Sequence, residues 1–130
     1  MAKILVVDDE PGYRTGLEFF LSRGGHEVLA VADISQSVEE ALQFAPDVLI
    51  ADWLLGARFT GADLARTLSE HLPNLQVILI TGLDANAVRR QLAGFQVYRI
   101  LEKPFEPATM GDAVRGAIAG LDAAHGSVGS

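Results

Sequence analysis

The feature of this sequence that most constrains its fold is the alternation of five short apolar runs with segments of helical periodicity. The runs occupy residues 4–7, 28–31, 48–51, 77–80 and 97–101, and the first, third and fourth are apolar throughout. Continuously apolar strands are typical of a parallel sheet that is covered on both faces. The alternation therefore predicts a doubly wound, five-stranded α/β fold, for which we expect the flavodoxin-like (βα)₅ strand order 2-1-3-4-5.

The segments between the runs carry apolar side chains at the spacing of amphipathic helices. Four side chains of the first helix are expected to face the core: Tyr13, Leu17, Phe20 and Leu21. The second helix is expected to start near Ser35 or Ser37, and the fourth to have Asp84 as its N-cap. The last helix opens with Pro107 and contains three glycines, so we expect its end to fray.

Length and composition place this chain among single globular domains. Its 130 residues suit one domain, which we expect over residues 1–121, with residues 122–130 as a flexible tail or the start of a linker. The absence of cysteine excludes disulfide frameworks, zinc–thiolate sites and cysteine nucleophiles. A net charge of −7 argues against direct contact with nucleic acid. No apolar run approaches the ~18–20 residues of a membrane span, and we expect a cytoplasmic protein.

Polar residues gather where the predicted strands end. Asp8 and Asp9 follow the first strand, Asp52 the third, Thr81 the fourth and Lys103 the fifth. Because ligands of doubly wound folds bind at the carboxyl edge, at the switch point between strands 1 and 3, these side chains should converge there. Three adjacent carboxylates repel one another unless a cation neutralises them or one is protonated. A hard divalent cation with oxygen ligands fits best, and Mg²⁺ is the usual one. Asp52 is then a candidate carboxylate nucleophile, with Lys103 and Thr81 binding phosphoryl oxygens.

Each of these residues also has an ordinary explanation. An Asp after a strand is commonly a turn residue or a helix N-cap, and a lone Thr or Lys at a strand end needs no function. Asp52 is harder to explain in this way, because a charge directly after a buried apolar run needs a partner. The coincidence of five suitable residues at four strand ends of one edge favours a site.

Four motifs at these strand ends make the sequence resemble the receiver domains of response regulators in two-component signalling. The resemblance covers residues 2–121 and is carried by Ile4-Leu-Val-Val-Asp-Asp-Glu-Pro11, Pro46-Asp-Val-Leu-Ile-Ala-Asp52, Ile80-Thr-Gly82 and Leu101-Glu-Lys-Pro-Phe105. It implies that Asp52 accepts a phosphoryl group from a histidine kinase or a histidine phosphotransfer protein. It also implies that Mg²⁺ is held by Asp9, Asp52 and the backbone carbonyl of Leu54, with Asp8 acting through water.

The resemblance further assigns roles to Lys103, which would bind the phosphoryl group, and to Thr81, which would be the switch hydroxyl. The Lys103–Pro104 bond is expected to be cis, as in the family. A receiver is not an enzyme in its own right, since it catalyses only its own phosphorylation and dephosphorylation. Its signal would pass by contact with a downstream protein or an attached output domain, from a monomer or weak dimer with no membrane contact.

One departure from the family pattern concerns the switch. Receivers of this family carry an aromatic residue three positions before the lysine, where this chain has Ile100. Tyr98 is expected on the same face of the same strand, two residues earlier. Ile100 has less area to move and no polar tip, so we expect a muted switch.

Two other functions remain open at the level of sequence. A phosphatase of the haloacid-dehalogenase type uses a similar set of residues, but it needs an Asp-x-Asp motif after the first strand, where this chain has Asp8-Asp9-Glu10. A receiver that has lost phosphorylation could act only as an interaction module. A flavodoxin-like cofactor site is disfavoured because the acidic residues after the first strand would repel a phosphate.

Overall fold

A parallel sheet in the order β2-β1-β3-β4-β5 forms the centre of the protein, as the sequence predicts. The structure, a computed structural model, describes residues 2–32, 34–56 and 59–129. Its strands are β1 (Lys3–Val7), β2 (Glu27–Val31), β3 (Val48–Asp52), β4 (Gln76–Thr81) and β5 (Arg99–Glu102). All neighbouring strands pair in parallel, with Ile4 opposite both Val28 and Val48 in the register. Their carboxyl ends therefore meet at one edge.

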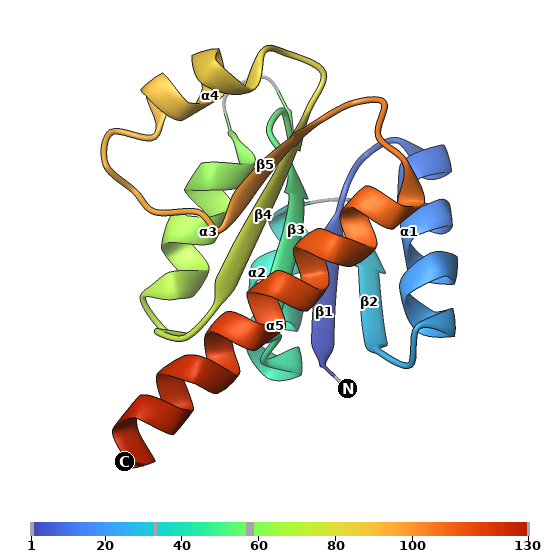
Figure 1. The fold of residues 1–130 in the computed structure, drawn as a ribbon. Coiled ribbons are helices and arrows are strands. Elements are labelled where there is room, and N and C mark those ends of the chain that lie inside the picture. The colour runs from blue at the N-terminus through green and yellow to red at the C-terminus, as the bar shows by residue number, and fades with distance from the viewer. Residues whose placement is uncertain (1, 33, 57–58, 130) are drawn as a thin grey trace.

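Helices cover both faces of this sheet (Figure 1). They are α1 (Pro11–Arg23), α2 (Ile34–Phe44), α3 (Gly61–Ser69), α4 (Ala85–Gln91) and α5 (Pro107–Gly129). Strand residues point alternately to two apolar clusters: Leu5 and Leu49 pack with α3 and α4, whereas Ile4 and Ile50 pack with α1 and α5. Each fully buried Leu or Ile contributes roughly 1.5–3 kcal/mol to stability. Double coverage explains why these strands are apolar throughout.

Local signals fix the start of the helices beside the carboxyl edge. Thr60 and Asp63 form a reciprocal capping box at the start of α3. A Cβ added at Gly61 would lie 2.5 Å from the carbonyl oxygen of Asp52, so glycine is what lets α3 approach the end of β3. Asp84 caps α4 as predicted, and Glu102 at the end of β5 accepts a second hydrogen bond from this helix, 2.8 Å from the Ala85 N–H.

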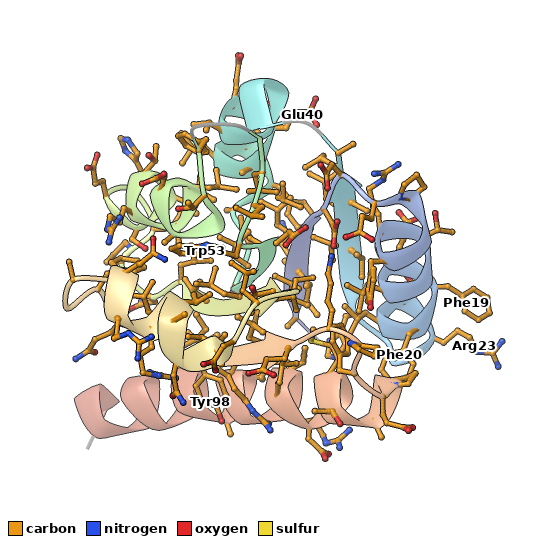
Figure 2. All side chains as sticks on the ribbon, turned by 90° about the horizontal axis from the view of Figure 1, so that it is seen from above. Phe19, Phe20, Arg23, Glu40, Trp53 and Tyr98 are labelled. Atoms are coloured by element: carbon orange, nitrogen blue, oxygen red, sulfur yellow. The ribbon has the colours of Figure 1, made fainter. Side chains whose placement is uncertain are left out.

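One prediction for the first helix needs correction. Leu17 and Leu21 are buried, but Phe20 is 37% exposed, because it lies at the margin of α1, beside Gly111 of α5 rather than under the helix. Figure 2 shows Phe20 turned toward α5 and Phe19 turned outward. The second helix begins at Ile34, next to Ser35, near which its start is expected.

The last helix, α5, is longer than its glycines led us to expect. It runs to Gly129, so residues 122–129 continue it where a tail is predicted. The division of the chain at residue 121 stays a prediction. Among the described residues, no helix has both the length and the apolar character to cross a membrane.

The prediction that Tyr98 shares a strand face with Ile100 is wrong. β5 begins only at Arg99, and Tyr98 lies at a bend before it. Ile100 packs with Val88 on the side of α3 and α4, whereas the Tyr98 ring lies against α5 (Figure 2). A Cβ added at Gly116 would collide with this ring, so the missing side chain at Gly116 provides the space that the tyrosine occupies.

Candidate functional site

The four strand ends bring most of the predicted site residues together. Asp52 and Thr81 are the last residues of β3 and β4, and both are buried. Asp8 follows β1 directly and is fully buried, whereas Lys103 follows β5. This edge of a doubly wound sheet is where ligands commonly bind.

The ammonium group of Lys103 lies at the centre of this site. Its Nζ atom is 2.6 Å from Glu10 Oε1 and 3.3 Å from both Asp8 Oδ2 and Asp52 Oδ2. These three carboxylates also lie within 4.8 Å of one another. Lys103 is therefore the internal cation that offsets their mutual repulsion.

Asp9 does not lie with Asp8 and Asp52, where the sequence predicts it. Within the described part of the chain, the carboxylate group consists of Asp8, Glu10 and Asp52, and Asp9 is exposed outside it. Sequence reasoning missed Glu10. One signal for it exists: Glu10 occupies the N-cap position of α1, where a side-chain oxygen can accept from the N–H groups of the first turn. No such bond is found among the described residues, because the Glu10 carboxylate turns to Lys103 instead.

Burial and charge shift the two central pKa values. Burial raises the pKa of Asp52, and the negative charge of Asp8 raises it further. The charge and hydrogen bond of Lys103 and the backbone N–H of Leu54 oppose that rise. Burial alone would lower the pKa of Lys103, but the bond to Glu10 and the charges of Asp52 and Asp8 outweigh it and raise the pKa. Lys103 is therefore held as a cation.

One oxygen of Asp8 has an ionic contact with Lys103 and no hydrogen bond among the described residues. Asp8 Oδ1 accepts the N–H of Glu10 at 2.9 Å, but Oδ2 is buried and accepts no hydrogen bond from the described residues. The same oxygen lies 3.3 Å from the Lys103 ammonium, and its remaining lone pairs are free to bind a second cation. Mg²⁺ binds carboxylate oxygens of this kind, so the donor set fits the ion that the sequence predicts.

Thr81 accepts two hydrogen bonds at the site, one with its side chain and one with its backbone. The Thr81 hydroxyl accepts the N–H of Leu83 at 2.9 Å, and the Thr81 carbonyl accepts the N–H of Lys103 at 2.7 Å. The Lys103–Pro104 bond is cis, as expected. Leu54 and Leu83 remain 54% and 48% exposed, on the loops that follow Asp52 and Thr81. Trp53, between Asp52 and Leu54 in sequence, is buried in the core (Figure 2).

Comparison with known protein families and curated sequences gives a consistent result. A model of the response regulator receiver domain matches residues 4–115 of this chain. FixJ, a transcriptional regulatory protein of Rhizobium meliloti, is 36% identical over 129 residues, which cover 95% of this chain and 60% of FixJ. The C4-dicarboxylate transport transcriptional regulatory protein DctD of Pseudomonas aeruginosa is 32% identical over 116 residues, covering 89% of this chain and 25% of DctD. The chain thus spans only part of the length of these two relatives.

The fold is also similar to solved structures. A response regulator receiver domain protein from Clostridium thermocellum has a TM-score of 0.77 at 29% identity, covering 92% of this chain and 95% of that chain. NtrX from Brucella abortus has a TM-score of 0.87 at 27% identity, covering 98% of this chain and 29% of that chain. Both similarities extend over nearly all of the sheet and its helices.

Proposed function

The chain belongs to the response regulator receiver family of two-component systems, and on this premise we propose that it accepts a phosphoryl group on Asp52. One observation carries the proposal: the buried Asp52 carboxylate lies 3.3 Å from the ammonium of Lys103, whose side chain is 9% exposed, at the switch-point edge of the sheet. The donor would be a phosphohistidine of a kinase or of a histidine phosphotransfer protein. The signal would then pass by contact with another protein or with an attached output domain.

In this proposal Asp52 acts as the nucleophile. One of its carboxylate oxygens bonds to phosphorus while the bond from phosphorus to the donor's histidine nitrogen breaks, and that bonding pair returns to the nitrogen. Lys103, 3.3 Å from Asp52 Oδ2, would bind the transferred group as a charge-assisted donor. The Thr81 hydroxyl would donate to the same group once it turns from its present bond with Leu83.

Four groups are proposed to hold Mg²⁺: Asp9, Asp52 and the carbonyl of Leu54 directly, and Asp8 through water. Asp9 is proposed instead of Glu10 because Glu10 makes the shortest of the three carboxylate contacts with Lys103, at 2.6 Å. When bound, the ion neutralises negative charge on the phosphoryl oxygens. Oδ2 of Asp8, which is buried and accepts no hydrogen bond from the described residues, supports a cation here.

The bounds of the receiver and its relation to DNA are proposed from the length of the matched sequence and from the net charge. We propose residues 1–121 as the receiver, with residues 122–130 leading away from it. FixJ and DctD are transcriptional regulatory proteins of which this chain matches a part. A net charge of −7 disfavours DNA binding by this chain, so any DNA contact of a longer regulator would use residues outside it.

Intact mass measurement after incubation with Mg²⁺ and a small-molecule phosphodonor tests the proposal. A receiver gains one phosphoryl group per chain. A haloacid-dehalogenase-like phosphatase instead releases phosphate with turnover and accumulates no lasting adduct. A receiver that acts only as an interaction module shows neither adduct nor phosphate, and either of these results would reject phosphoacceptance on Asp52.

A further inference from the structure

Lys103 has a fourth partner besides the three carboxylates. Its Nζ atom lies 4.2 Å from the centroid of the Tyr13 ring. A cation within about 6 Å of an aromatic centroid is attracted by the ring quadrupole. Tyr13 is half-buried in the first turn of α1, and the Lys103 side chain is only 9% exposed, so water screens this contact little.

A second aromatic residue holds the Tyr13 ring in place. The centroid of Phe105, two residues after Lys103, lies 5.7 Å from that of Tyr13, with the rings tilted by 42°. The tyrosine thus packs between α1 and the segment that follows β5, the same segment that carries the lysine. Its ring position is coupled to the backbone that sets the direction of Lys103.

The ring and the carboxylates hold the ammonium in physically different ways. Glu10, Asp8 and Asp52 attract the charge as anions, and a bond to any of them points an N–H at an oxygen. A ring face attracts the charge through its quadrupole and leaves the N–H groups able to turn to another acceptor. When a phosphoryl group brings new oxygens to Asp52, Lys103 must exchange acceptors without leaving the site.

We propose that Tyr13 is a positioning residue that acts through Lys103. Its ring keeps the ammonium beside Asp52 while the N–H donors move from Glu10 to the phosphoryl oxygens. This inference rests on the proposed function, and it adds a residue of α1 to the groups that prepare the site. The ring contact adds to the three ion pairs that hold the long, flexible lysine side chain near the nucleophile before any phosphoryl group arrives.

The test compares two substitutions at one position. Tyr13→Phe keeps a ring face, whereas Tyr13→Leu keeps apolar volume without the quadrupole. Beryllofluoride, a phosphoryl mimic, is titrated in the presence of Mg²⁺ while the fluorescence of Trp53 is followed. We expect Tyr13→Phe to bind the mimic within about twofold of wild type and Tyr13→Leu to bind it about fivefold more weakly. Equal affinities of Tyr13→Phe and Tyr13→Leu for the mimic would overturn the proposal.

A double-mutant cycle separates action through Lys103 from a general effect on the fold. In a Lys103→Gln background, Tyr13→Leu should cause no further loss of affinity for the mimic. An equal loss in both backgrounds would show that Tyr13 acts by another route. Tyr13→Met serves as a second ring-free variant, and circular dichroism verifies that each variant is folded.

A readout without metal or phosphate tests the geometry itself. In the free protein, the ε-methylene protons of Lys103 should have NMR signals moved upfield by the ring current of the residue at position 13. The shift should persist in Tyr13→Phe and vanish in Tyr13→Leu, and a wild-type protein without it contradicts the contact. A wild-type protein that binds no beryllofluoride overturns the proposed function together with this inference. A wild-type response that Tyr13→Leu leaves unchanged overturns only the role of Tyr13.

Discussion

Lys103 and Asp52 are in direct contact across 51 residues of sequence, with 3.3 Å between Nζ and Oδ2. The contact joins the carboxyl ends of β3 and β5, which are not neighbours in the sheet, across the end of β4. Asp52 nevertheless has a raised pKa, because burial and the charge of Asp8 outweigh the attraction of the lysine. The ionised nucleophile is therefore destabilising for the folded protein.

Replacing this charge should stabilise the fold. A group whose folded pKa is raised contributes stability that is present below its unfolded pKa and lost as the pH rises through the folded value. Asp52→Asn should therefore raise the free energy of unfolding at pH 7 by about 1 kcal/mol, with a smaller gain near pH 4. Urea denaturation in the presence of a metal chelator measures both values. A variant less stable than wild type at pH 7 would mean that Lys103 more than compensates the buried charge.

Substitutions that keep the side-chain shape and remove one negative charge can show which acid binds the metal. If Asp9 holds Mg²⁺, Asp9→Asn should weaken binding by about tenfold, because the site loses a carboxylate ligand. Glu10→Gln should have the smaller effect, because the Glu10 carboxylate of the wild type is already bound to Lys103. A Mg²⁺ titration followed by the fluorescence of Trp53 reports both variants. The reverse order of the two effects would assign the ligand to Glu10, and an Asp9 variant that titrates like wild type would reject Asp9.

The phosphorylated form should be long-lived. Hydrolysis needs a water placed in line behind phosphorus, and the exposed side chains two positions after Asp52 and Thr81 are Leu54 and Leu83. Neither leucine can hydrogen-bond that water. Leu54→Asn or Leu83→Glu should speed the loss of phosphate by about tenfold.

A matched control for this decay measurement is Phe19→Asn, which changes an exposed apolar residue on α1 and should leave the rate unchanged. The rate is measured after removal of the phosphodonor. If both leucine variants decay at the wild-type rate, these positions do not gate the approach of water.

The conformational response to phosphorylation should be small. Ile100 is packed with Val88 and Leu92, and it has no polar group that could form a new bond when Thr81 moves. Tyr98 cannot replace the missing aromatic, because it lies outside β5 and against Gly116. Amide exchange with and without beryllofluoride should show little change over residues 84–106. Ile100→Tyr should enlarge that change, and strong protection in the wild type would contradict the prediction.

The sheet and the edge that carries the site could be predicted because both depend on local patterns. Continuous apolar runs identify strands covered on both faces, and the residue that ends each run identifies the carboxyl edge. Asp8, Asp52, Thr81 and Lys103 lie at that edge for this reason. No tertiary information was needed for the strand order once five βα units were recognised.

The remaining features depend on contacts between distant residues. Asp9 and Glu10 are adjacent acids after the same strand, and the turn into α1 decides which of them reaches Lys103. The position of the Tyr98 ring depends on the space that Gly116 of α5 leaves free. The contact between Tyr13 and Lys103 likewise joins α1 to the end of β5. Periodicity within a segment carries no information about such pairs.

The most direct measurement of the central claim is intact mass after treatment with a phosphodonor and Mg²⁺, made on three proteins. Wild type and Asp112→Asn, a control on the exposed face of α5, should each gain one phosphoryl group. Asp52→Asn should gain none, because it lacks the carboxylate that forms the bond to phosphorus. A phosphoryl adduct on Asp52→Asn equal to that of the wild type would contradict the assignment of Asp52 as the acceptor.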